Sequence, residues 1–234
     1  DVGELVSAKG IAEGVSNSNW LIETSGGSSN GARFILTMYE RRIELDDLPY
    51  FLGLLDHLSA KGCPVPRTIH DRAGAAFRME QGKAVALIEF LPGVSPTLPT
   101  PAQARSIGEV LARMHLASAD FALVRSNTMG FADNLKTLER FGEARLSAIS
   151  PHLPAMLEPA RMAAELDMSA LPKANVHADL FPDNVLMLGD TVTGLIDFYF
   201  ACSDVMALDL AVTHAAWCFD HANQYLPQLG EALL

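Results

Sequence analysis

One short stretch of the sequence places three oxygen-bearing side chains where they could act together. Asp179 and Asn184 lie in the segment HADLFPDN, residues 177–184, and Asp197 follows thirteen residues after Asn184. Amide and carboxylate oxygens are ligands that Mg²⁺ prefers, and a nearby carboxylate can orient a hydroxyl group that attacks a phosphoryl group. The pattern therefore predicts phosphoryl transfer, with Asp179 as the base and Asn184 and Asp197 as metal ligands.

A predicted β-hairpin brings these side chains together. Gly189-Asp190 has the composition of a two-residue turn. The resulting register pairs Asn184 with Leu195, and it pairs Pro182 with Asp197. Asn184 and Asp197 are then two residues apart across the ladder, which is roughly 7 Å at a rise of ~3.3 Å per residue. Two oxygen ligands at that separation can share one cation.

The same residues also have a purely structural interpretation. Asp183 and Asn184 could cap turns, and Asp197 could end a strand. That interpretation leaves unexplained why three ligand-type side chains converge on one hairpin. His177 is expected to fix the loop through a hydrogen bond; a His-x-Asp pair could also bind a transition metal, but no further His or Cys lies at ligand spacing.

Three residues outside this stretch have candidate roles. His115, near the end of a predicted helix, is expected to pack or to cap the helix end. Asp204 and Asp209 are acidic and follow the predicted metal ligand closely in the sequence. Asp209 is expected to brace the loop that carries Asp179, and Asp204 is a candidate contact for an amino group of the substrate.

Composition and charge exclude several classes of protein. The 234-residue chain is 49% hydrophobic and 19% charged, which is too apolar for a disordered protein and enough to bury a core. Its formal net charge of −11 would repel a phosphate backbone, so no nucleic-acid partner is expected. A small-molecule substrate is expected instead, and the sequence does not indicate the oligomeric state.

The cysteines and the apolar stretches bear on location. Cys63, Cys202 and Cys218 are widely spaced, odd in number and outside any CxxC pattern, which predicts reduced thiols in the cytoplasm. The longest apolar stretch, residues 84–91, is interrupted by Glu89 and is too short to span a bilayer. No signal peptide is recognisable, and no membrane association is expected.

Hydrophobic periodicity predicts a sheet-rich part, residues 1–91, and a mostly helical part, residues 92–234. Leu91-Pro92-Gly93 makes a break between them that suits a hinge. The predicted strands are 19–23, 33–39, 84–90, 185–188 and 191–198. One predicted helix is capped by Asp46 or Asp47 and ends at Gly62, and a second follows the capping box Thr100–Gln103. Residues 120–170 and 204–221 are also predicted to be helical.

The segment HADLFPDN, together with Ile196-Asp197-Phe198, resembles the catalytic loop and metal-binding aspartate of the aminoglycoside phosphotransferase and choline kinase superfamily, which is related to protein kinases. Three further segments are similar to the homoserine kinases of that superfamily, as are residues 177–202. They are KGIAEGVSNSN (residues 9–19), LTMYE (36–40) and DLPYFLGL (47–54).

This resemblance implies a two-lobed α+β fold of the protein-kinase type, with a small antiparallel sheet in the first lobe and a larger, mostly helical second lobe. It implies ATP and Mg²⁺ as cofactors and L-homoserine as the acceptor. The loop at residues 10–19 would cover the ATP phosphates, and the hinge would offer backbone groups to adenine. The nucleotide contacts implied are Gly14, Ser16, Asn17, Ser18, Glu89, Phe90 and Leu91.

The sequence departs from the superfamily pattern at one position. The superfamily usually places Lys or Arg on the third strand to hold the α- and β-phosphates, whereas the matching residue here is Thr37. The positive charge could come from Arg41, Arg42 or Lys9. Nucleotide binding could instead depend more on Mg²⁺ and backbone amides.

Two alternative functions remain open at this point. The same scaffold could phosphorylate choline, ethanolamine, a sugar or an aminoglycoside; a choline site favours aromatic cages, and aromatic residues make up only 7% of the chain. The protein could also be a nucleotide-binding regulator that has lost catalysis. Thr37 supports the regulator, whereas the intact set of Asp179, Asn184 and Asp197 argues against it.

Overall fold

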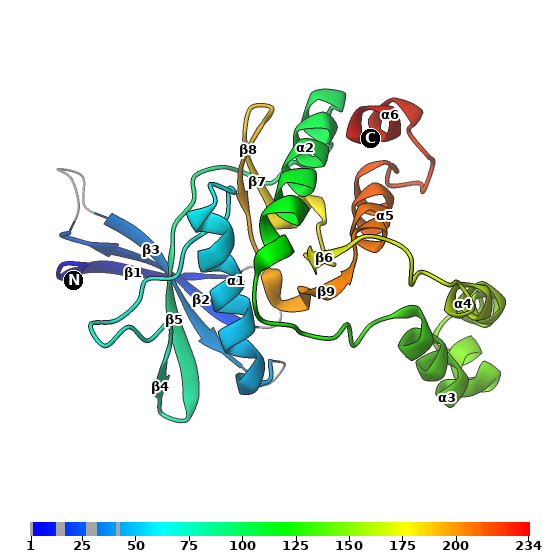
Figure 1. The fold of residues 1–234 in the computed structure, drawn as a ribbon, viewed down its shortest axis with the longest axis horizontal. Helices are drawn as coiled ribbons and strands as arrows, with labels where there is room; N and C mark the ends of the chain where they lie inside the picture. Colours follow the sequence, from blue (N-terminus) through cyan, green and yellow to red (C-terminus); the bar gives the residue numbers. More distant parts are fainter. Residues whose placement is uncertain (1, 13–16, 27–31, 41–42) are drawn as a thin grey trace.

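A computed structural model describes residues 2–12, 17–26, 32–40 and 43–234 of the chain. Figure 1 shows a β-sheet at one end of the molecule, a helix packed beside it, and further helices toward the opposite end. This arrangement confirms the expected α+β fold with a sheet-based lobe and a mostly helical lobe.

The first lobe is built on a five-stranded antiparallel sheet with the strand order β1-β2-β3-β5-β4. In β5 every second residue is buried, namely Ala84, Ala86 and Ile88, as expected for a strand with one face against a core. The three strands predicted in this part of the sequence are confirmed as β2, β3 and β5. The strands are β1 (Leu5–Ile11), β2 (Asn17–Thr24), β3 (Ala32–Tyr39), β4 (Arg78–Glu80) and β5 (Lys83–Glu89).

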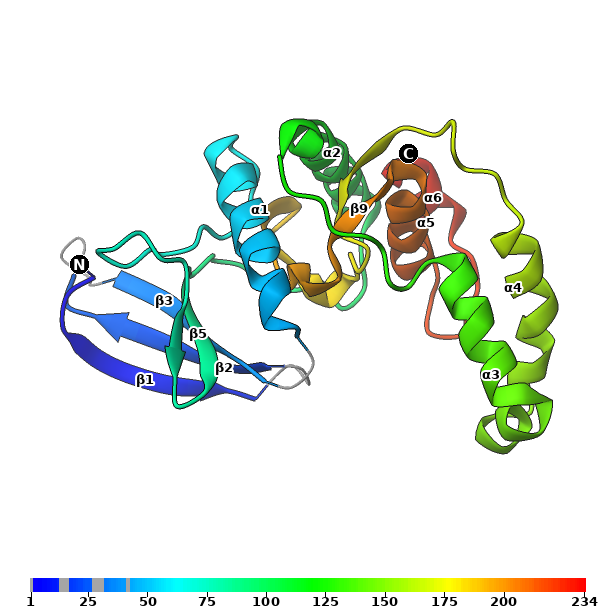
Figure 2. The same ribbon diagram turned by 60° about the horizontal axis from the view of Figure 1, so that its bottom comes forward.

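Helix α1 (Leu48–Ala60) lies between the sheet and the second lobe (Figure 2). Its buried face consists of leucines and aromatic residues. The helix ends before Gly62, whose φ of 76° is easily adopted by a residue without a Cβ atom. Asp47, one of the two predicted residues, occupies the N-cap position, but it makes no side-chain cap hydrogen bond, and its carboxylate instead accepts from Arg125 Nε at 2.6 Å.

Helix α2 (Pro101–Ala117) runs through the second lobe. The Thr100 hydroxyl accepts from the Gln103 backbone N–H at 3.2 Å, and Gln103 Oε1 accepts from the Thr100 backbone N–H at 3.1 Å, which confirms the predicted capping box. Helix α6 (Pro227–Leu233) approaches α2 closely at Gly108. A Cβ atom at Gly108 would lie 2.1 Å from a backbone carbonyl oxygen of α6, so this contact requires glycine.

Two small antiparallel pairs and one helix carry the candidate chemistry. β6 (Lys173–Val176) pairs with β9 (Cys202–Val205). β7 (Val185–Leu188) pairs with β8 (Thr191–Leu195). Helix α5 (Met206–Trp217) directly follows β9, so all of these elements are close to one another in the chain and in space.

Two boundaries predicted in this region are wrong. Asp204 belongs to β9, where it pairs with Ala174, and the helix predicted from residue 204 begins only at Met206. The predicted strand over 191–198 ends early, because Asp197 adopts a left-handed backbone conformation, with φ 63° and ψ 57°, that interrupts an extended chain.

The hairpin register also differs by one residue from the prediction. Val185, rather than Asn184, lies opposite Leu195. The turn joins Leu188 to Thr191, as predicted. Beyond Val192 the register shifts by one residue, because Thr193 lies opposite no residue of β7 and forms a β-bulge.

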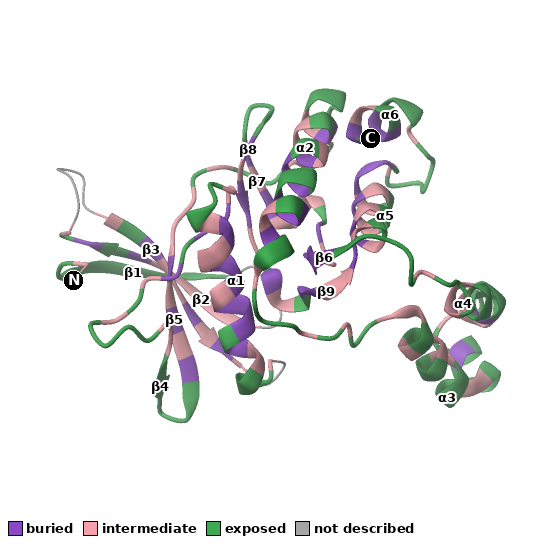
Figure 3. Cartoon of the chain, in the orientation of Figure 1, coloured by how far each residue is buried: buried purple, intermediate pink, exposed green. Residues whose placement is uncertain are grey.

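Helices α3 (Phe131–Ile149) and α4 (Leu157–Ala164) form a pair that projects away from the rest of the molecule (Figures 1 and 2). Figure 3 shows the pair as a mixture of exposed and intermediate residues, and its buried residues are Leu146 of α3 and Leu157 of α4. Helix α3 is interrupted at Gly142, where φ is 69° and ψ is 160°. The helical character predicted for 120–170 is confirmed over 131–149 and 153–164, whereas residues 121–130 and 165–170 contain no helix.

A continuous apolar core joins the two lobes. Phe51 of α1, Ile107 of α2, Val185 of β7 and Leu229 of α6 belong to the same buried cluster. Burial of apolar surface therefore stabilises the packing of the lobes against each other. Across the ranges that the structure covers, we find no helix with the length and apolarity that a bilayer span needs.

Candidate active site

The loop between β6 and β7 brings Asp179 and Asn184 into direct contact. The side-chain nitrogen Nδ2 of Asn184 donates to the backbone oxygen of Asp179 at 2.8 Å and to its carboxylate Oδ2 at 3.2 Å. Both contacts use the nitrogen of the amide group. The amide oxygen of Asn184 therefore keeps its capacity to bind a cation or a donor.

Asp197 follows the end of β8 and is joined to the same loop. The backbone N–H of Ile196 donates to the backbone oxygen of Asn184 at 3.0 Å. Burial raises the pKa of the Asp197 carboxyl, and the negative charge of Asp179 adds to that shift. The three predicted residues thus share one region of negative potential, which a bound cation would neutralise.

The Asp179 carboxyl has the electrostatic character of a proton acceptor. Burial raises its pKa above the ordinary value of 3.8, although the hydrogen bond from Asn184 opposes the shift. A carboxylate with a raised pKa takes up a proton more readily than an exposed aspartate does. This shift suits a group that receives a proton from a hydroxyl during reaction.

Asp209, in the first part of α5, holds the loop from beneath. Its Oδ2 accepts from the His177 backbone N–H at 2.9 Å, and its Oδ1 accepts from the Ala178 backbone N–H at 2.8 Å. Ala178 has a φ of 63°, a left-handed conformation that costs roughly 1–2 kcal/mol for a residue with a Cβ atom. The two hydrogen bonds hold this strained residue beside Asp179, as the predicted bracing role requires.

His115 completes the support of the loop. It is buried in α2, and its Nε2 contacts Asp209 Oδ2 at 2.8 Å. Burial alone would raise the pKa of Asp209, but the hydrogen bonds with His115 and with the His177 backbone N–H lower it overall. The sequence predicted only packing or helix capping for His115, because its partner lies 94 residues further along the chain.

His177 fixes the loop from within, as predicted. Its Nε2 lies 2.9 Å from the backbone oxygen of Ile196, so Nε2 carries a proton and donates it. Its Nδ1 accepts from the Asp179 backbone N–H at 3.3 Å. The neutral tautomer with the proton on Nε2 satisfies both contacts and connects Asp179 to the residue before Asp197.

Of the predicted phosphate contacts in the first loop, Gly14 and Ser16 lie outside the described residues. Asn17 and Ser18 belong to β2. The Ser18 hydroxyl donates to Glu40 Oε1 at 3.0 Å, and Lys83 Nζ pairs with Glu40 Oε2 at 2.8 Å. The Ser18 hydroxyl therefore already has a partner within the first lobe.

The predicted adenine contacts lie where β5 leads into the second lobe. The Glu89 backbone N–H donates to the backbone oxygen of Arg67 at 3.0 Å. The Phe90 ring lies under the guanidinium of Arg33, 4.7 Å from its centre. Leu91 packs closely on the β7–β8 hairpin, where its side chain contacts Gly194.

Asp204 is engaged in local structure. Its Oδ2 accepts from Asn127 Nδ2 at 2.7 Å, and its Oδ1 accepts from the Val205 backbone N–H at 2.7 Å. No hydrogen bond described for this residue joins it to Asp179. A substrate amino group at Asp204 would have to share the carboxylate with Asn127.

Thr37, at the strand position where a cation is usual, is 2% exposed. Its hydroxyl donates to Asn19 Oδ1 at 2.8 Å. Of the alternative cations, Arg41 and Arg42 lie outside the described residues. Lys9 is an exposed residue of β1.

A cavity of about 570 Å³ lies elsewhere, on the outer side of the sheet. Leu36, Val85 and Leu87 contribute to its lining, and they alternate along their strands with residues that face the core. None of the loop residues described above lines this cavity. It is therefore separate from the candidate active site.

The fold has relatives among solved structures of small-molecule kinases. Amicoumacin kinase in complex with AMP-PNP and Ca²⁺ has a TM-score of 0.74 at 13% identity, covering 99% of this chain and 72% of that chain. Choline kinase from Streptococcus pneumoniae has a TM-score of 0.64 at 16% identity, covering 99% of this chain and 75% of that chain. At such identities the likeness establishes the fold, which is of the protein-kinase-like type.

The chain belongs to the phosphotransferase enzyme family, whose profile matches residues 7–234. A homoserine kinase of Allorhizobium ampelinum is 46% identical over 240 residues, covering 100% of this chain and 71% of the relative. A homoserine kinase of a Bradyrhizobium species is 45% identical over 226 residues, covering 94% of this chain. The chain spans 66% of the length of that second relative. The predicted resemblance to homoserine kinases of this superfamily is confirmed.

Proposed function

We propose that this protein transfers the γ-phosphoryl group of ATP to the hydroxyl group of L-homoserine, forming O-phospho-L-homoserine on the route to threonine. Relatives that carry the name homoserine kinase, at 45–46% identity, support the choice of acceptor. The observation that carries the chemistry is the contact of Asn184 with Asp179 beside Asp197.

The residues present fit a divalent cation, and we assign Mg²⁺ to them. The Asp197 carboxylate and the free amide oxygen of Asn184 form a hard, all-oxygen donor set, as Mg²⁺ requires. Burial raises the pKa of Asp197, and the nearby carboxylates of Asp179 and Asp183 raise that pKa further, which a cation would offset. When bound, the metal would neutralise charge on the phosphates of ATP.

Asp179 performs the proton chemistry in this proposal. Its carboxylate accepts a hydrogen bond from the acceptor hydroxyl, which orients the oxygen for in-line attack on the γ-phosphorus, and it takes the proton as the new O–P bond forms. ADP leaves with the electrons of the broken bond. Asn184, His177 and Asp209 hold the loop so that this carboxylate stays in position.

The nucleotide is assigned to the junction of the lobes. Residues 1–91 form the nucleotide-binding lobe in this proposal, and residues 92–234 form the catalytic and acceptor-binding lobe. Gly14, Ser16, Asn17 and Ser18 are proposed to lie over the phosphates, and Glu89, Phe90 and Leu91 to border the adenine.

Two further assignments are part of the proposal. Asp204 is proposed to contact the amino group of homoserine, in exchange for its hydrogen bond with Asn127. A cytoplasmic location is supported by the three cysteines, none of which forms a disulfide.

The test is a coupled assay of ADP release from Mg·ATP with homoserine, choline, ethanolamine and an aminoglycoside as acceptors. Turnover with homoserine well above that with the other three is expected. Turnover with another acceptor alone would overturn the assignment of substrate. Absence of turnover with every acceptor, together with retained nucleotide binding, would favour a nucleotide-binding regulator.

A further inference from the structure

The strand position where a cation is usual carries the hydroxyl of Thr37, and a pair of tyrosine hydroxyls begins at Tyr39, two residues further along β3. The Thr37 hydroxyl donates to Asn19 Oδ1. The Tyr199 hydroxyl donates to the Tyr39 hydroxyl at 3.3 Å. Thr37 and Tyr39 are each 2% exposed, so each hydroxyl depends on a partner within the protein for its hydrogen bond.

Tyr199 is anchored on the first lobe by its ring as well as by its hydroxyl. The ring packs edge-on against Tyr39 of β3, with centroids 5.6 Å apart and an interplanar angle of 86°. It packs in the same manner against Phe51 of α1, at 5.7 Å and 89°. Edge-to-face pairs of this kind are favourable beyond the area that they bury.

The same residue belongs to the turn that carries Asp197. Tyr199 lies in the 3₁₀ turn Phe198–Phe200. Asp197 directly precedes this turn and has a left-handed backbone conformation. A non-glycine residue in that conformation persists only where its surroundings hold it.

We propose that the hydrogen-bonded hydroxyls of Tyr39 and Tyr199 position Asp197 for the divalent cation, without a cation on β3. The proposal rests on the proposed function, because it takes Asp197 as the metal ligand. Tyr199 is a positioning residue here, since it acts on Asp197 and not on the nucleotide or the acceptor. Neutral hydroxyls suit this buried place, where an ammonium group would lose its hydration.

The test compares Tyr199→Phe and Tyr39→Phe with the control Tyr50→Phe. Each variant keeps its ring and loses one hydroxyl. Tyr50 is a matched control because its hydroxyl also joins the lobes, donating to Asn175 Oδ1 at 2.8 Å, and its hydrogen bond and ring pairs do not involve Tyr39 or Tyr199. We expect the Mg²⁺ concentration for half-maximal rate to rise about threefold to tenfold in the first two variants, as the loss of one hydrogen bond implies.

The unfolding temperature and the Mg²⁺ requirement together separate a positioning role from a general effect on stability. The unfolding temperature is expected to fall in all three variants, whereas the Mg²⁺ requirement changes only at Tyr39 and Tyr199, with the KM for the acceptor unchanged. The double variant Tyr39→Phe/Tyr199→Phe is expected to need no more Mg²⁺ than the worse single variant, because either change breaks the same link. A control variant with an equally raised Mg²⁺ requirement would overturn the proposal.

Direct binding distinguishes this inference from the proposed function. Binding of Mn²⁺ in the presence of AMP-PNP can be measured on the same variants without any acceptor. Weaker Mn²⁺ binding in Tyr199→Phe but not in Tyr50→Phe would uphold the inference even if homoserine were not the substrate. Unchanged Mn²⁺ binding in both Tyr39→Phe and Tyr199→Phe would overturn the inference, even if the wild-type protein phosphorylates homoserine.

Discussion

The loop at residues 177–184 and the helix pair α3–α4 belong to the same lobe but are held in opposite ways. In the loop, Asp209 accepts hydrogen bonds from two successive backbone amides and from His115, and it is 0% exposed. In the helix pair, the polar contacts lie at the surface, such as Arg161 with Glu139 at 3.5 Å, with both side chains 49% exposed.

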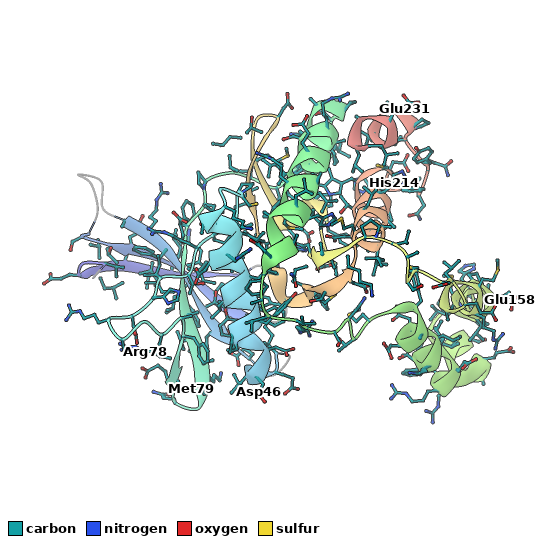
Figure 4. All side chains as sticks on the ribbon, viewed as in Figure 1. Asp46, Arg78, Met79, Glu158, His214 and Glu231 are labelled. Atoms are coloured by element: carbon teal, nitrogen blue, oxygen red, sulfur yellow. The ribbon has the colours of Figure 1, made fainter. Side chains whose placement is uncertain are left out.

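The difference shows where this protein uses its buried polar interactions. A loop with a strained residue beside the candidate base is held by charged and neutral hydrogen bonds in a setting of low dielectric, where each bond is strong and its loss is costly. The helix pair has almost no buried side chain, and Glu158, labelled on α4 in Figure 4, illustrates its charged, outward-pointing surface. Substitutions should therefore have very different effects in the two regions.

The largest effect is expected at Asp179. Asp179→Asn removes the proton acceptor and keeps the shape of the side chain, so turnover should fall about 10²–10⁴-fold. Nucleotide binding should remain nearly unchanged. Asp190→Asn, at the turn of the hairpin, is the control and should retain the wild-type rate; full activity in Asp179→Asn would contradict the role of the base.

Removal of the support under the loop is expected to cost stability as well as activity. Asp209→Ala leaves His115 without its partner and two backbone amides unsatisfied, which should lower the free energy of unfolding by about 3–5 kcal/mol. The matched change on α3, Asp133→Ala, should stay within about 0.5 kcal/mol. Urea unfolding measures both, and equal losses in the two variants would remove the distinction between the regions.

The contribution of Asp209 should depend on pH in one direction. Its pKa is lowered in the folded protein from the ordinary value of 3.8, so the unfolded chain takes up this proton first as the pH falls. The stability difference between wild type and Asp209→Ala should be constant from neutral pH down to about pH 5 and should shrink as the pH drops below about 4. A difference that grows on acidification would show that Asp209 is buried in its neutral form.

An intermediate effect is expected at the start of α2. Thr100→Ala removes the side-chain half of the capping box, which should lower the free energy of unfolding by about 1 kcal/mol. Thr100→Ser keeps a hydroxyl at the same place and should restore most of the loss. Thermal unfolding of the two variants would show whether the cap or merely the size of the side chain matters.

The smallest effect is expected in the helix pair. Arg161→Ala breaks the exposed contacts with Glu139 and Glu158 and should change the free energy of unfolding by less than about 0.5 kcal/mol. The rate of phosphoryl transfer should not change. A large loss of activity on this substitution would mean that the α3–α4 surface contributes to function after all.

The sequence predicted what depends on residues close together in the chain. The capping box at Thr100, the turn after Leu188 and the convergence of Asn184 with Asp179 follow from local spacing and local propensity. The short strands β6 and β9 carry too few residues for a periodic signal. The sequence did not reveal the bulge at Thr193, which changes the register of the β7–β8 hairpin. The Thr193 hydroxyl donates to the backbone oxygens of Leu186 and Pro92, and no local pattern shows these contacts.

The features that the sequence did not reveal are contacts between distant segments. His115 meets Asp209 across 94 residues, and Tyr199 meets Tyr39 across 160. In each case the residue type alone fits ordinary packing, so only the fold shows the partner. The local pattern therefore gives the reacting residues, and the tertiary structure gives the residues that hold them.

The central claim is that Asn184 and Asp197 hold one divalent cation beside Asp179. Enhancement of water-proton relaxation by Mn²⁺ in the presence of AMP-PNP measures that cation directly. The enhancement should be strong for the wild-type protein and for Asp190→Asn, and should be largely lost for Asn184→Ala and Asp197→Asn. Unaltered enhancement in both of these last variants would contradict the claim, because the cation would then be held by other residues.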